Sequence, residues 1–114
     1  MANDAQKQTL LNAVSLIRAA EQALVTASRT STDPNTSIQI NTEYQHLDSL
    51  LGQLLQAQAI ADDADFASAA AALQQQASAL QTDETQIQKI VTDVGTAAKI
   101  AGYLAQAASF LATL

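Results

Sequence analysis

The stretch of sequence that decides the fold is FASAAAALQQQASALQTDETQIQKIVTDVGTAAKIA, residues 66–101. One set of positions in it recurs at alternating steps of four and three residues, which is the spacing of one face of an α-helix. These positions are Phe66, Ala70, Leu73, Ala77, Leu80, Glu84, Ile87, Val91, Val94, Ala98 and Ala101. Because the step is unbroken, the pattern predicts one helix of roughly fifty residues, about 75 Å long.

A turn inside this stretch is the alternative interpretation. Thr82 is a suitable helix N-cap at Thr82-Asp83-Glu84, and a second candidate turn lies near Gly95. Either turn divides the long helix into two and leads to an up-down four-helix bundle. In that bundle the last helix lies among the others and completes the core, so the two architectures differ in what covers the C-terminal twenty residues.

Two shorter helices are expected before the long one. In residues 5–29, Leu10, Ile17 and Leu24 recur every seven residues, each followed three residues later by an alanine, which is typical of a heptad seam. A loop is expected at residues 28–37, SRTSTDPNTS, because its polar side chains compete for the backbone and its proline disfavours a helix. A second helix then ends near residue 60. The 114 residues are thus predicted to form one domain, an antiparallel three-helix bundle with a long third helix.

Composition and charge restrict the classes of function. Eleven acidic and five basic residues give a net charge of −6, and the chain has no cysteine. Nucleic-acid binding depends on clustered Lys and Arg, which here lie far apart, so no nucleic-acid partner is expected. The polar start, MANDAQKQTLLNAV, lacks the basic and apolar segments of a Sec signal peptide. A cytoplasmic location is therefore expected, with export without a Sec signal as the alternative.

The C-terminal stretch Gly95–Leu114 carries a single charge, Lys99. On a helical wheel its apolar residues cover about two-thirds of the circumference, more than the stripe of a surface helix. Residues 96–114 are therefore predicted to be an oligomerisation or partner-docking helix that contacts a second copy or another protein. The predicted interface residues are Ile100, Tyr103, Leu104, Phe110, Leu111 and Leu114. Membrane contact is the alternative, and both Lys99 and the predominance of alanine oppose it.

Four further side chains are candidates for a shared site. Glu43 and His46 form a Glu-x-x-His pair on one helix face, and Glu21 and Glu84 are expected at a similar height on the other two helices. This set is similar to half of the ligand set of di-iron carboxylate bundles, so a two-metal site would need a homodimer. The structural interpretation is that these are helix-end and boundary residues, and the sequence leaves open whether they converge.

No other pattern in the chain indicates chemistry. There is one histidine and no cysteine, no Gly-rich phosphate loop, and no nucleophile with a base beside it. We therefore predict no catalytic residue, no cofactor and no metal ligand. The predicted function is a non-enzymatic helical module for interaction or oligomerisation. The alternatives are an exported or membrane-active helical protein and a metal-binding homodimer.

Overall fold

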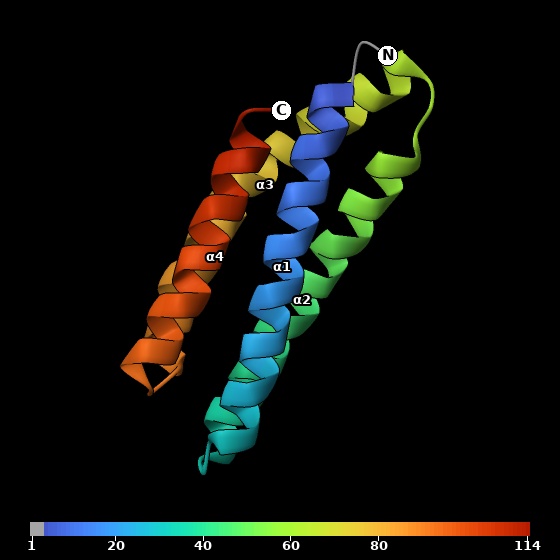
Figure 1. Cartoon of the computed structure of the whole chain (residues 1–114). Coiled ribbons are helices and arrows are strands. Elements are labelled where there is room, and N and C mark those ends of the chain that lie inside the picture. Colours follow the sequence, from blue (N-terminus) through green and yellow to red (C-terminus); the bar gives the residue numbers. More distant parts are fainter. Residues whose placement is uncertain (1–3) are drawn as a thin grey trace.

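The computed structural model describes residues 4–114, which are helical apart from short links and the C-terminal end. The helices are α1 (Asp4–Thr30), α2 (Pro34–Ala59), α3 (Asp63–Ile90) and α4 (Val94–Ala112). Each helix packs on the next one along the chain, and α4 packs back on α1 to close the ring (Figure 1). The described residues therefore form an up-down-up-down four-helix bundle that measures 49 × 18 × 18 Å.

The predicted long third helix is wrong, because the chain reverses direction at residues 91–93. Val91 has an extended backbone at the end of α3, and Asp93 caps the start of α4. The predicted face breaks at this point, since Val94 is 81% exposed and Ala98 is also exposed. The four-helix alternative is confirmed in its helix count, with the turn beside Gly95 and not at Thr82, which lies within α3.

Each of the three links has three residues and ends in an aspartate that caps the following helix. Asp33, Asp62 and Asp93 accept hydrogen bonds from backbone N–H groups in the first turns of α2, α3 and α4. These bonds satisfy donors that the start of a helix otherwise leaves unpaired. The short links hold each pair of consecutive helices antiparallel and adjacent. The polar side chains of α2 therefore lie beside α1 and α3.

The core is one cluster to which all four helices contribute. The heptad seam predicted for the first helix is confirmed, because Leu10, Ile17 and Leu24 are fully buried. The alanines that follow them are buried as well, so neighbouring helices approach α1 closely along this line. At one end, Lys7 Nζ donates a hydrogen bond to the Ile60 carbonyl at 2.6 Å and lies over the Phe66 ring, which ties α1 to the second link.

The cap at Asp93 gives a direct test of the turn. Its carboxylate accepts hydrogen bonds from the backbone N–H and the hydroxyl of Thr96, and these bonds lower the pKa of Asp93. We expect Asp93→Ala to lower the free energy of unfolding measurably at neutral pH, because the N-cap acceptor is lost. Asp93→Asn retains an acceptor oxygen and should lose less, as measured by urea unfolding. If the two variants were equally stable, the cap would not contribute to the turn.

The contribution of this cap should also depend on pH. A carboxyl whose folded-state pKa is lowered stabilises the fold above its usual pKa, and this stabilisation is lost as the pH falls through the folded-state value. The difference in stability between wild type and Asp93→Ala should therefore be fully present at neutral pH. It should shrink in strongly acidic solution.

Candidate functional site

The structure divides the predicted interface of α4 into two groups. Three of its residues lie in the core of the single chain and are 0% exposed: Ile100, Leu104 and Leu111. The other three are half-buried and pack against the core: Tyr103 and Phe110 on α4, and Leu114 just after its end. The buried group is covered by α1 and α3, which flank α4 on both sides. For half of the predicted interface residues, helices of the same chain thus provide the contacts that were expected from a partner.

The four candidate side chains of the shared site do not meet at one place. Glu43 and His46 on α2 face α3, but the residue that meets them there is Asp83 and not Glu84. Glu21 on α1 instead faces the other side of α2. The question of convergence, which the sequence left open, is answered by two separate clusters, one on each side of α2.

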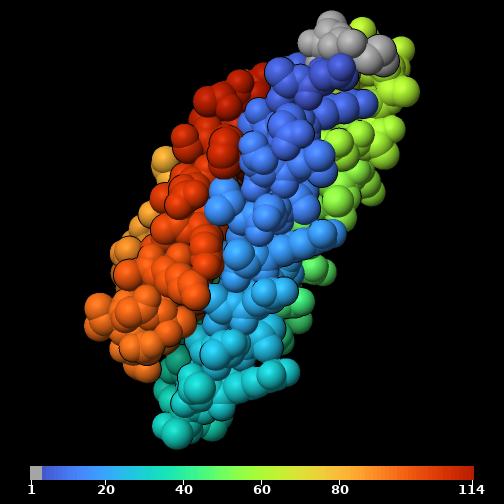
Figure 2. Space-filling model, viewed as in Figure 1, coloured from blue at the N-terminus to red at the C-terminus, as the bar shows by residue number. Residues whose placement is uncertain are grey.

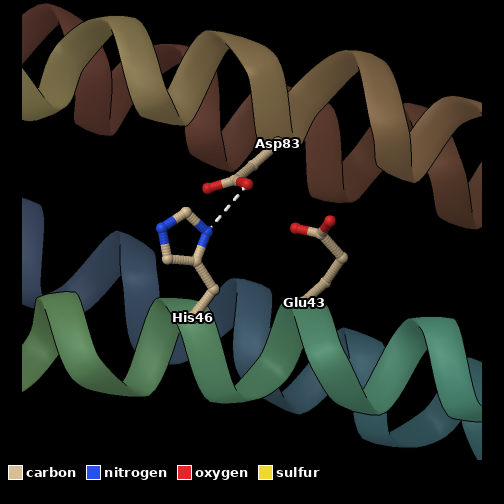
Figure 3. A group of neighbouring side chains, drawn as sticks. All are labelled: Glu43, His46 and Asp83. Atoms are coloured by element: carbon tan, nitrogen blue, oxygen red, sulfur yellow. Dashed lines mark hydrogen bonds and ion pairs between the residues drawn. The ribbon is translucent and has the colours of Figure 1, made fainter.

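The first cluster, between α2 and α3, consists of Glu43, His46 and Asp83 (Figure 3). Glu43 and His46 are three residues apart, so both project from the same face of α2, and Asp83 points toward them from α3. His46 Nδ1 lies 2.9 Å from Asp83 Oδ1. One potential ligand atom from each residue lies within 4.8 Å of the other two. Within residues 4–114, this is the group of His, Asp and Glu side chains close enough to share an ion.

Burial makes this cluster electrostatically unusual. Asp83 is 5% exposed, and Glu43 Oε2 is buried without a hydrogen-bond partner. Burial, and then the neighbouring carboxyl group of Asp83, raise the pKa of Glu43 to about 7, while His46 has a smaller opposing effect. The two carboxyl groups therefore resist carrying two negative charges at the same time.

The second cluster, between α1 and α2, pairs Glu21 with Asp48. Glu21 is 5% exposed, and burial, a hydrogen bond to Asp48 and the charge of Asp48 raise the pKa of Glu21 to about 7. Arg18 and a hydrogen bond from Tyr44 oppose this shift. A hollow of about 240 Å³ adjoins the pair, and Arg18, Tyr44 and Asp48 are among its lining residues.

Asp83 was not among the predicted site residues, because a helical face allows a step of either three or four residues. The predicted face ran from Leu80 to Glu84, whereas the buried positions are Leu80, Asp83, Ile87 and Ile90. Asp83 therefore occupies a core-facing position. The signal available in the sequence was Ile90, because steps of three, four and three residues from Leu80 lead through Asp83 to that isoleucine.

No helix among residues 4–114 is long and apolar enough to cross a membrane. Comparison of the chain with models of protein families, with curated proteins and with solved structures gave no match. The surfaces and clusters described above are therefore the features that bear on the function.

Proposed function

We propose that this protein is a non-enzymatic interaction module that associates with a second copy of itself across the outer surface of α4. Figure 2 shows α4 along one edge of the molecule, beside α1. The observation that carries the proposal is the chemistry of this surface. Most side chains on this surface are small and none is acidic. The half-buried apolar residues Tyr103 and Phe110 lie beside it.

The charge distribution favours α4 as the contact. The chain has a net charge of −6, so two copies repel each other over most of their surface. Helix α4 contains no Asp or Glu and one charged residue, Lys99. Contact through α4 therefore brings together the part of the described chain with the least negative charge.

The shape of α4 also favours close approach. Gly95, Gly102 and Ser109 lie seven residues apart on its solvent side, and a Cβ added at Gly102 would meet no atom within 4 Å. A glycine in a helix interior costs about 0.5–1 kcal/mol relative to alanine. No contact within the single chain requires a glycine at position 102. A second helix lying against this line would benefit from the missing side chain, with Tyr103 and Phe110 beside the contact.

The test is the solution mass by light scattering after size exclusion, across a hundredfold concentration range. We expect a dimer for the wild type. Gly102→Leu places a large side chain in the contact and should weaken dimerisation at least tenfold, about 1.4 kcal/mol. The matched control is Gly52→Leu on α2, where a Cβ also meets nothing within 4 Å, and it should leave the mass unchanged.

Two results would overturn the proposal. One is a monomer at every concentration. The other is a dimer that persists in Gly102→Leu, or that Gly52→Leu weakens equally, because the contact would then lie elsewhere. Circular dichroism of both variants establishes that a change in mass reflects the surface and not loss of the fold.

A further inference from the structure

We propose that Glu43, His46 and Asp83 bind a single divalent transition-metal ion that links α2 to α3. This inference is independent of self-association, because the three residues belong to one chain and to helices other than α4. It rests on the position of the ligand atoms, on a buried oxygen without a partner, and on the chemistry of the donor set.

The geometry requires little rearrangement. Zinc binds His nitrogen and carboxylate oxygen at about 2.0–2.2 Å, which places two ligand atoms of one ion about 3–4 Å apart. The three potential ligand atoms here lie within 4.8 Å of one another, and His46 Nδ1 is 2.9 Å from Asp83 Oδ1. Small side-chain rotations are enough to bring all three to one ion. His46 is held by an adjacent carboxylate, so its ring is already directed into the space between the helices (Figure 3).

The buried oxygen is the second observation. Glu43 Oε2 is buried and has no hydrogen-bond partner, and an unsatisfied buried polar atom costs about 1–3 kcal/mol. Its neighbour across the helix interface, Asp83, is also a carboxylate and cannot donate a hydrogen bond when ionised. A cation between them would satisfy this oxygen and separate two like charges that the fold otherwise places side by side.

The donor set selects the class of ion. One imidazole nitrogen with two carboxylate oxygens suits Zn²⁺, Fe²⁺ or a related transition ion, whereas Ca²⁺ and Mg²⁺ prefer sites made of oxygen alone. To bind the ion through Nδ1, His46 would give up the proton that Nδ1 donates to the ionised Asp83 carboxylate and would carry its proton on Nε2, which Figure 3 shows directed away from Asp83. The His46 side chain is 50% exposed, so the site can be reached from solvent and water can complete the coordination.

The experiment is isothermal titration of Zn²⁺ into chelator-treated full-length protein, at pH 7.5 and physiological salt. We expect one Zn²⁺ per chain. His46→Ala should weaken binding by more than about 100-fold, because loss of even an outer partner of a metal ligand costs 10–100-fold. His46 is half exposed, so this variant should fold. Glu43→Gln provides an independent second test of the same ligand set.

The matched control is Glu84→Gln, which removes an acidic side chain from the next position on α3 without touching the cluster. It should bind Zn²⁺ like the wild type, and Mg²⁺ in tenfold excess should not compete. The proposal is overturned if Zn²⁺ does not bind. It is equally overturned if His46→Ala and Glu84→Gln reduce affinity equally, since binding would then reflect only the overall acidity of the surface.

Discussion

Leu104→Ala is expected to lower the free energy of unfolding by about 3 kcal/mol, a large fraction of the stability of a domain of this size. Leu104 is 0% exposed within the single chain, and its truncation removes buried apolar area and leaves a cavity that the neighbouring helices fill only in part. Val94→Ala is the matched control on the same helix, because Val94 is 81% exposed. It should change stability by less than about 0.5 kcal/mol.

The measurement is urea unfolding followed by circular dichroism at two protein concentrations. If Leu104 belongs to the core, its loss appears at both concentrations with the same magnitude. If Leu104 instead belonged to a contact between copies, the loss would grow with concentration and vanish in the dilute sample, because only the associated form would use the side chain. That outcome would contradict the packing of α4 between α1 and α3.

Leu104 lies on α4, the helix that the sequence pattern predicted least well. The first helix was predicted at residues 5–29 and lies at Asp4–Thr30, because large and small side chains repeat there without interruption and a proline-containing link follows. The long third helix was wrong because a three-residue link happens to preserve the steps of four and three. Periodicity reports which residues are apolar, and it does not report whether the backbone between them is helical.

Local chemistry favoured the turn that was considered only as the alternative. Ile90, Val91 and Thr92 are three consecutive β-branched residues, which are poorer helix formers. Asp93 follows them as the N-cap of α4, just as Asp33 is the N-cap of α2. Once the chain turns here, the buried face of α4 shifts from the predicted Val94 and Ala98 to Ala97, Ile100 and Leu104. The burial of Ile100, Leu104 and Leu111 within the single chain thus follows directly from the turn.

The candidate site was predictable only in part for a different reason. The pair of Glu43 and His46 was evident because two residues on one helix, three apart, share a face whatever the tertiary structure. Their partner on α3 depends on the rotation of that helix, and a rotation of one residue exchanges Glu84 for Asp83. The pairing of Glu21 with Asp48 depends in the same way on the register between α1 and α2, which no short-range pattern determines.

Glu21→Gln is expected to stabilise the protein at pH 8 by roughly 2 kcal/mol and to have little effect near pH 4. Burial and Asp48 raise the pKa of Glu21 to about 7 in the folded chain, from an ordinary value of 4.5. Between these values the unfolded chain loses the proton while the folded chain keeps it, so stability falls as the pH rises from about 4.5 to 7. Above pH 7 both states are ionised and the full penalty remains, at about 1.4 kcal/mol for each pKa unit before allowance for solvent.

Glutamine removes this penalty because it is neutral at every pH and its amide can donate a hydrogen bond to the Asp48 carboxylate. The measurement is the melting temperature of wild type and Glu21→Gln at pH 4, 5, 6, 7 and 8, with Glu84→Gln as a control for the loss of one negative charge. The two curves should lie close together at pH 4 and separate progressively up to pH 7. A constant separation, or an equal gain in Glu84→Gln, would mean that net charge controls the effect, and that the buried carboxyl pair between α1 and α2 does not.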